Sequence, residues 1–137
     1  MNKKEAAQVV AILKASYPNH PAYRNLTAED AQGIVAVWSM HFADVSAEVV
    51  LLALNKWVST NQHPPSISEI NDKISSVSWD AYGKLEQHYR LKHLSEEMYE
   101  YYRRIHKETE RFKYKNNEFS IGSMFPKKYI KQIERDG

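Results

Sequence analysis

Apolar residues recur at helical spacing along most of the chain, and no segment of its first half alternates with the period of a β-strand. Steps of three and four predict an amphipathic helix over residues 3–16, ending before Pro18. Three further helices are predicted over residues 27–41, 47–59 and 66–77. The third of the four is apolar over most of its circumference and is expected at the centre. The pattern therefore predicts an all-α protein whose first half is a compact four-helix bundle.

Polar residues that precede these segments match the preferences of helix starts. Thr27 stands before two acidic residues, which complement the helix dipole in a first turn. Ser46 is placed to cap the third helix. Ser66 and Glu69, directly after two prolines, have the capping-box spacing in which each side chain accepts from the other residue's backbone. The caps thus support the predicted boundaries.

The second half carries a helical stripe of apolar residues with no evident core of its own. A long helix is predicted over residues 79–115, and Ser95 with the acids after it predicts a break near residues 93–95. A lone helix cannot bury such a stripe, which must meet the first half, a second copy or another protein. We favour another protein and therefore a binding adaptor. The predicted partner-binding residues of the stripe are Leu91, Leu94, Met98, Tyr101, Ile105 and Phe112.

Residues 116–137 are predicted to form a loop and a short amphipathic helix that Pro126 opens. Short, terminal and amphipathic segments commonly dock on a partner. The apolar edge of this helix consists of Phe125, Tyr129, Ile130 and Ile133, with Lys127, Lys128, Lys131 and Arg135 on the other side. The predicted organisation is thus a bundle over residues 1–78, a helical extension over 79–115 and a docking segment over 116–137.

Length and composition limit the class of protein. With 137 residues and a net charge of +2, the chain is long enough for one compact domain and an extension. The absence of cysteine excludes disulfides, thiolate zinc sites and cysteine nucleophiles. No apolar run approaches the roughly 20 residues that cross a bilayer, and no signal-peptide core follows Met1. We expect a cytoplasmic protein without a membrane partner.

Signals for catalysis or for a metal are weak. The four glycines do not bracket a phosphate-binding loop, and the six histidines form no zinc motif, so they are expected on the surface. Acidic residues from Glu96 to Glu110 lie among basic ones and are expected to face solvent rather than a shielded pocket. We predict no enzyme, no cofactor and no metal. The three tryptophans, Trp38, Trp57 and Trp79, are expected in the core.

A nucleic-acid interpretation stays open in the second half. Basic residues alternate there with aromatic ones, a pattern that can follow a phosphate backbone while rings stack on bases. The overall charge is too small for a dense basic surface, so a solvated helix face is favoured. The residues of this alternative site are Arg103, Arg104, Lys107 and Arg111.

Several short motifs occur in the first half in a characteristic order. They are Tyr17-Pro18, Leu26-Thr27, Val37-Trp38, Phe42-Ala43-Asp44-Val45, Lys56-Trp57, Thr60-Asn61 and Pro64-Pro65-Ser66-Ile67 with Ile70. In order and spacing, residues 5–75 resemble the small replicative-helicase loader and inhibitor proteins of bacteriophages. The resemblance implies a helical adaptor without ATPase motifs, active in the bacterial cytosol. It implies a hexameric DnaB-type helicase as partner, an origin-binding protein that receives the helicase, and a helicase contact in the carboxyl region.

The leading hypothesis is therefore a phage replication adaptor that loads or inhibits a DnaB-type helicase. The alternatives are a single-stranded or origin DNA-binding protein and a phage inhibitor of another host enzyme. Self-association through the stripe of residues 91–112 also stays open.

Overall fold

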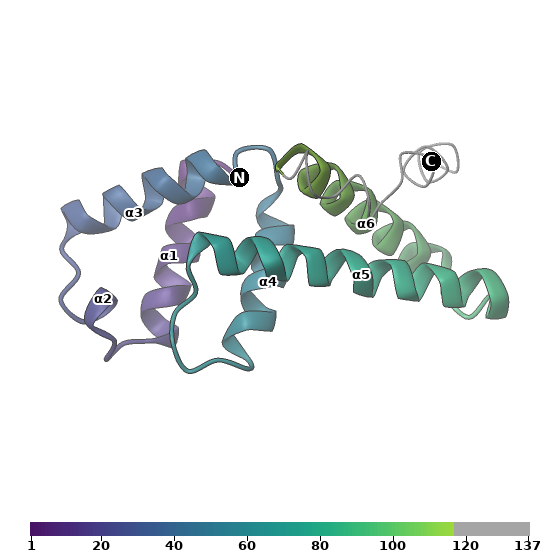
Figure 1. Cartoon of the computed structure of the whole chain (residues 1–137), viewed down its shortest axis with the longest axis horizontal. Helices are drawn as coiled ribbons and strands as arrows, with labels where there is room; N and C mark the ends of the chain where they lie inside the picture. The colour runs from purple at the N-terminus through teal and green to yellow at the C-terminus, as the bar shows by residue number, and fades with distance from the viewer. Residues whose placement is uncertain (117–137) are drawn as a thin grey trace. The chain divides into compact units, whose positions relative to one another are not determined.

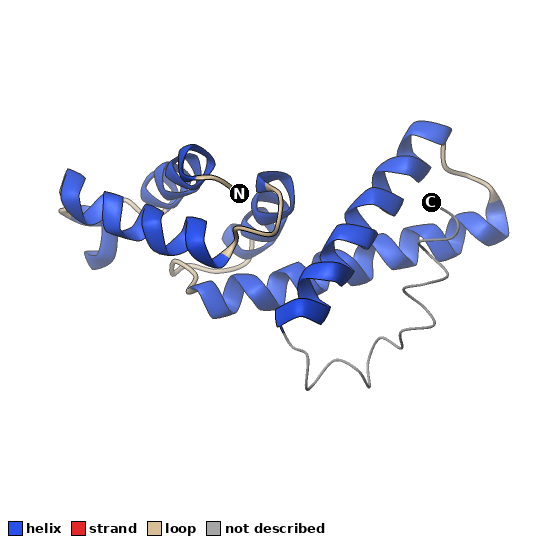
Figure 2. Cartoon of the chain, turned by 90° about the horizontal axis from the view of Figure 1, so that it is seen from above, coloured by secondary structure: helices blue, strands red, loops and turns tan. Residues whose placement is uncertain are grey.

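The computed structural model describes residues 1–116, and in that part of the chain it contains six helices and no strand (Figures 1 and 2). The all-α prediction is confirmed. The predicted loop and terminal helix lie almost entirely beyond these residues. The helices are α1 (Lys3–Ser16), α2 (Pro21–Arg24), α3 (Ala28–His41), α4 (Ala47–Val58), α5 (Ile67–Leu91) and α6 (Glu96–Asn116).

The chain divides into two compact units, residues 1–73 and 74–137, with the border inside α5. None of the helices within residues 1–116 has the length and apolar character that crossing a membrane requires.

In the first unit, α1 packs mainly against α3 and also contacts α4 and α2. Five of the twelve residues of α4 are buried, more than in α1 or α3, as its apolar circumference predicts. The side chains that are most completely excluded from solvent in this unit include Val9, Leu13, Phe42, Val49, Val50 and Leu54. Burial of these aliphatic and aromatic groups is the main force that holds the unit together.

The predicted caps are present. Thr27 Oγ1 accepts from the Asp30 backbone N–H at 3.0 Å, and Ser46 Oγ accepts from that of Val49 at 3.3 Å. At the start of α5, the Glu69 N–H donates to Ser66 Oγ at 3.1 Å, and the Ser66 N–H donates to Glu69 Oε1 at 3.0 Å. This reciprocal pair is the capping box that the sequence predicts.

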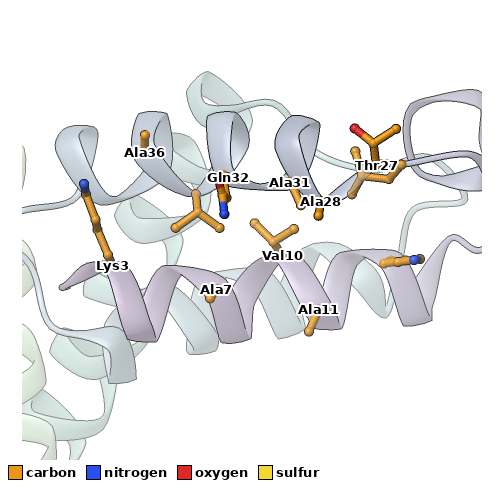
Figure 3. Close-up of a pocket in the computed structure, with 12 residues that line it drawn as sticks. Lys3, Ala7, Val10, Ala11, Thr27, Ala28, Ala31, Gln32 and Ala36 are labelled. Carbon is orange, nitrogen blue, oxygen red and sulfur yellow. The ribbon is translucent and has the colours of Figure 1, made fainter.

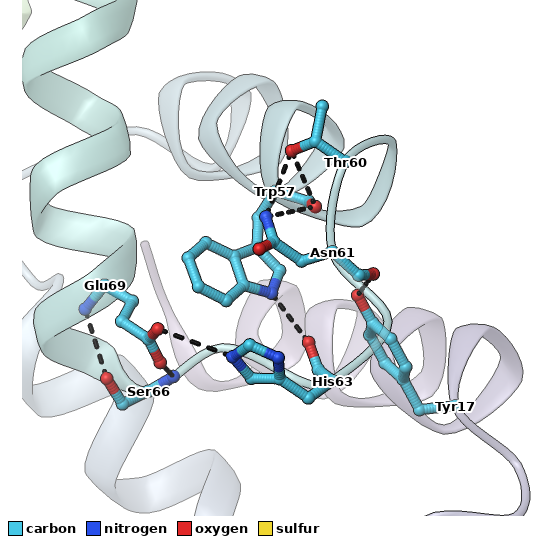
Figure 4. Close-up of polar contacts among 7 residues, drawn as sticks. All are labelled: Tyr17, Trp57, Thr60, Asn61, His63, Ser66 and Glu69. Atoms are coloured by element: carbon cyan, nitrogen blue, oxygen red, sulfur yellow. Dashed lines mark hydrogen bonds and ion pairs between the residues drawn. The ribbon is translucent and has the colours of Figure 1, made fainter.

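The loop between α4 and α5 is fastened by residues of the sequence motifs (Figure 4). Trp57 Nε1 donates to the His63 carbonyl at 2.8 Å, and Asn61 Nδ2 donates to the Trp57 carbonyl at 3.0 Å. Tyr17 at the end of α1 donates its hydroxyl to the Asn61 carbonyl at 3.0 Å. Trp57 and Tyr17 are both buried, so their hydrogen bonds hold the loop against α4 and α1.

The structure differs from the predicted helices in two places. The fourth helix does not end near residue 77, because α5 continues unbroken to Leu91. No proline or glycine interrupts it before Gly83, and Gly83 lies inside the helix. The loop after Pro18 contains the short helix α2, which the sequence interpretation missed. Pro21 occupies its first turn and His20 Nδ1 accepts from the Ala22 N–H at 3.1 Å, so a single turn forms.

Candidate partner-binding surface

The second unit contains an antiparallel pair of helices, α5 from Ile74 onward and α6. Contacts between the helices run in opposite directions along the chain: Ser78 meets Glu110, Tyr82 meets His106, and Tyr89 meets Tyr99. Figure 2 shows this helical hairpin. We call it the hairpin.

The turn of the hairpin lies where the sequence predicts a break. Lys92 adopts a left-handed backbone conformation, with φ of 52°, and its N–H donates to the His88 carbonyl at 2.7 Å. The Leu94 N–H donates to His88 Nδ1 at 3.0 Å. Both the carbonyl and the side chain of His88 therefore accept hydrogen bonds at the end of α5. Ser95 Oγ then accepts from the Met98 N–H at 3.2 Å and caps α6.

Several large apolar residues are exposed close to the turn of the hairpin. Leu91 is 64% exposed, Tyr89 51% and Met98 40%, while Leu94 is half-buried. We call these four residues the hairpin-tip surface. A single exposed apolar residue is ordinary, whereas several near one turn favour an interaction site.

Aromatic rings and cations stiffen the same end. The His88 and Tyr99 rings lie 5.0 Å apart, and the Tyr89 and Tyr99 hydroxyl groups are 3.4 Å apart. Lys92 Nζ lies 5.9 Å from the Tyr89 ring, which is within reach of a cation–π interaction. The tip is therefore held by side-chain contacts from both helices.

The other end of the hairpin contains a buried polar cluster. Ser78 Oγ donates to Glu110 Oε1 at 2.6 Å, Lys113 Nζ lies 3.5 Å from the same oxygen, and His106 Nε2 lies 3.9 Å from it. All four side chains are nearly inaccessible to solvent. Lys113 Nζ also lies 5.7 Å from the centre of the Trp79 ring. We call this set the buried ionic cluster.

Burial controls the protonation of the cluster. It lowers the pKa of His106 to about 4, with a contribution from the nearby Lys113 charge, so His106 is neutral at neutral pH. Burial also raises the pKa of Glu110, although the Ser78 hydrogen bond and Lys113 oppose this shift. The pKa of Lys113 is lowered by burial against the opposing effect of Glu110. Burial thus shifts the pKa of His106, Glu110 and Lys113 in the direction that favours the neutral form of each side chain.

The histidine, serine and carboxylate of the cluster do not favour a catalytic interpretation. Ser78 and His106 are completely buried, so a substrate has no access to their polar atoms in this conformation. Among residues 1–116, no three His, Asp or Glu side chains come together in a way that could hold a metal ion.

Comparison with known families covers the part of the chain that precedes the hairpin. Residues 1–71 match the family described as the N-terminal domain of the phage helicase loader/inhibitor gene 39 protein. The chain belongs to the gene 39 protein family. The resemblance inferred from the motifs is thereby confirmed. No curated protein and no solved structure matches the chain.

In this member of the gene 39 protein family, the hairpin exposes some residues of the predicted partner-binding stripe and buries others. Leu91 and Met98 are exposed, and Leu94 and Tyr101 are half-buried. Ile105 and Phe112 are buried, at 2% and 4% exposure, and so face the interior rather than a partner in this conformation. The remaining residues of the set, Phe125, Tyr129, Ile130 and Ile133, lie outside the described residues.

The four residues of the nucleic-acid alternative fall on one side of α6, as their spacing requires. Arg104 and Arg111 are exposed, and Lys107 is half-buried. Arg103 lies 3.3 Å from Glu100, which offsets its charge. This side is therefore less basic than the sequence alone suggests.

Three expectations about individual residues are wrong. Trp79 is 45% exposed, unlike Trp38 and Trp57, which are in the core as predicted. His106 and Glu110 are buried, although the sequence predicts histidines and acids at the surface. Lys113 is buried beside them. The sequence contains a signal for this burial. His106, Glu110 and Lys113 follow at steps of four and three, so they share one side of the helix. Each lies next to a residue of the buried set Ile105, Thr109 and Phe112. The buried face is rotated from the predicted stripe toward these polar residues.

The buried histidine predicts acid sensitivity. A base whose pKa is lower in the folded state than in the unfolded one resists protonation when folded. Lowering the pH from 6.5 to about 4 therefore favours unfolding through His106. The free energy of unfolding falls by about 3 kcal/mol over this range, because each unit of pKa difference corresponds to roughly 1.4 kcal/mol. Urea unfolding at neutral and acidic pH should show a larger loss of stability for the wild type than for His106→Gln.

Glu110 titrates in the opposite sense, because its raised pKa makes protonation favour the folded state. Glu110 is present in both the wild type and His106→Gln, so its contribution cancels when the acid sensitivities of the two proteins are compared. The exposed His93 provides the control, since His93→Gln should retain the acid sensitivity of the wild type. Equal acid sensitivity of the wild type and His106→Gln would contradict the assignment.

Proposed function

We propose that this protein is a non-catalytic adaptor that binds a hexameric DnaB-type replicative helicase in the bacterial cytoplasm. Membership of the phage helicase loader/inhibitor family supports the class of partner. The observation that carries the location of the contact is the hairpin-tip surface, where Leu91 and Met98 are exposed beside the turn between α5 and α6. It lies beyond the residues that match the family, so this assignment rests on the hairpin alone.

The chemistry of the tip suits a protein partner better than DNA. Exposed apolar groups gain free energy when they leave water, and Tyr89 adds an aromatic ring of the kind that is enriched in binding hot spots. Acidic residues Glu96 and Glu97 begin α6 next to this surface and would repel a phosphate backbone. Lys92 lies over the Tyr89 ring, where its charge can guide encounter with an acidic rim.

The proposed mechanism is differential binding. An adaptor that binds one conformation of a helicase ring more tightly shifts the hexamer toward that conformation. Release follows when an origin-binding protein or DNA favours another conformation, because the couplings between ligands are reciprocal. Loading and inhibition are then two outcomes of one binding equilibrium, and no bond is made or broken by the adaptor.

The test is the affinity for a purified DnaB-type helicase, measured by biolayer interferometry with the full chain. The double variant Leu91→Glu/Met98→Glu should bind about 10- to 100-fold more weakly, because it places two charges in an apolar contact. Ile12→Glu is the matched control, since Ile12 on α1 is 40% exposed, as Met98 is. Equal affinity of the double variant and the wild type would remove the hairpin tip from the proposal.

A truncated chain tests the share of the terminal segment. By sequence, residues 122–137 carry the apolar residues Phe125, Tyr129, Ile130 and Ile133. Deletion of this segment should abolish co-purification with the helicase while the circular dichroism of a helical protein is retained. Full binding by the truncated chain would remove the terminal segment from the proposal.

A further inference from the structure

A groove lies between α1 and α3, and both of its walls belong to the first unit (Figure 3). Its volume is about 760 Å³. Five of the twelve residues that line it are alanine, and Val10, Leu26 and Val35 are also apolar. Because the distance between packed helices depends on the size of the side chains at the contact, short alanine side chains allow a further helix to approach both walls closely.

The apolar lining of this groove is partly in contact with water. Val10 points from α1 toward Ala31 of α3 and is buried, whereas Ala7 and Ala11 on the same wall are exposed. On the facing wall, Ala28 is exposed as well. The groove therefore presents apolar surface that a further element would remove from water.

The rim of the groove is basic. Lys3 and Lys14 stand at the two ends of the α1 wall, and no acidic residue is among the described residues that line the groove. The acids in the first turn of α3, Glu29 and Asp30, line the neighbouring groove between α2 and α3 instead. Lys14 follows Lys3 by eleven residues, which on a helix corresponds to about 16 Å and nearly three full turns. The two lysines thus lie on the same side of α1.

We propose that this groove binds an amphipathic helix of another protein, one whose apolar side faces the alanine walls and whose flank carries acidic residues opposite Lys3 and Lys14. A helix that lies along α1 meets both lysines when its acids are about eleven residues apart, because this spacing also places them on one side. Recognition of an amphipathic helix by an apolar groove is a common mode of peptide binding.

Charge complementarity favours this occupant over the others. A second copy that presented the same groove in a two-fold arrangement would bring basic rims together. The terminal residues 122–137 carry three lysines and one arginine against two acids, so the same rim repels them. A nucleic-acid backbone would be attracted by two lysines but would gain nothing from walls of alanine. An acidic amphipathic helix matches both the rim and the walls.

This surface is separate from the proposed helicase contact. The groove lies within the residues that match the gene 39 protein family, whereas the hairpin tip lies beyond them. An adaptor with two such surfaces can bind two partners at once. The proposal does not depend on the identity of the helicase contact, and failure of either leaves the other intact.

The first test is fluorescence anisotropy with the full chain and labelled helical peptides of about five turns. The acidic peptide has an apolar stripe of alanine and leucine flanked by glutamates eleven residues apart, and the basic peptide has lysines in place of those glutamates. The acidic peptide should bind with a dissociation constant of roughly 100 μM, and the basic one at least about 10-fold more weakly. Failure of the acidic peptide to bind up to millimolar concentration, or equal binding of both peptides, would overturn the proposal.

A groove-filling variant tests the location. Ala7→Phe occupies the space between the walls and should weaken binding of the acidic peptide about 10-fold or more. Ala15→Phe is the matched control, because Ala15 is also exposed on α1 but does not line the groove, so this variant should bind as the wild type does. Equal affinity of Ala7→Phe and Ala15→Phe would place the contact elsewhere and refute the proposal.

Charge reversal tests the chemistry of the partner. The double variant Lys3→Glu/Lys14→Glu should prefer the basic peptide to the acidic one. Lys84→Glu/Arg90→Glu changes the net charge by the same amount at exposed positions of α5 and should keep the preference of the wild type. An unchanged preference in the first variant would contradict the role of the lysines. Sedimentation that showed a wild-type dimer, lost in Ala7→Phe, would mean that a second copy fills the groove and would also overturn the proposal.

Discussion

Replacement of Glu110 by alanine is expected to lower the free energy of unfolding by about 3–5 kcal/mol, the typical effect of removing one partner from a buried ion pair. Glu110 Oε1 is the common neighbour of Ser78, His106 and Lys113 in the buried ionic cluster. Without it, Lys113 retains its burial and loses the neighbouring negative charge. Urea denaturation followed by circular dichroism measures the effect.

A double variant separates the charge effect from the loss of packing. Glu110→Leu combined with Lys113→Met replaces the pair by apolar groups of similar size, and such replacements are often neutral or stabilising. We expect the double variant to regain most of the stability that Glu110→Ala loses. If Glu110→Ala lost less than about 1 kcal/mol, the carboxylate would be behaving like an exposed group, for which such small values are typical.

Replacement of Trp57 by alanine is expected to destabilise the first unit by about 3–5 kcal/mol. The indole is 7% exposed, and Nε1 donates to the His63 carbonyl at 2.8 Å. The variant would therefore create a cavity and also release the loop that leads to α5. Differential scanning calorimetry or urea unfolding should show the loss, and Trp57→Phe should recover part of it by refilling the cavity without the hydrogen bond.

Trp79 is the matched control for Trp57. Its side chain is 45% exposed, so Trp79→Ala removes less buried area and should cost clearly less than Trp57→Ala. A loss at Trp79 as large as that at Trp57 would show that exposure does not decide the contribution of these tryptophans.

The sequence was sufficient to predict the elements that local chemistry determines. Thr27, Ser46 and the pair Ser66 and Glu69 cap helices because a side-chain oxygen three residues from a backbone N–H can reach it in any protein. The break before Ser95 follows from the same principle. The motif residues Tyr17 and Trp57 were correctly associated with a family, although their hydrogen bonds to the loop were not foreseen.

Rules of composition failed where tertiary packing overrides them. The sequence shows that Glu110 and Lys113 can approach each other on a helix, but such pairs are usually solvated, and only the position of Ser78 on the facing helix distinguishes this one. The exposure of Trp79 and the burial of Ile105 depend on how α6 is rotated against α5. A rotation of less than one residue step changes which side chains face inward, and periodicity does not resolve it.

The uninterrupted course of α5 restricts how chain length can vary. Within the second unit, its buried residues Ile74, Val77, Ala81 and Leu85 follow at steps of three and four. Insertion of one residue near Val77 would advance the downstream helix by about 1.5 Å and turn it by about 100°. Ala81 and Leu85 would then leave the line that Ile74 begins. Variation in length that keeps this unit intact is therefore expected in the turn after Leu91 rather than inside the helix.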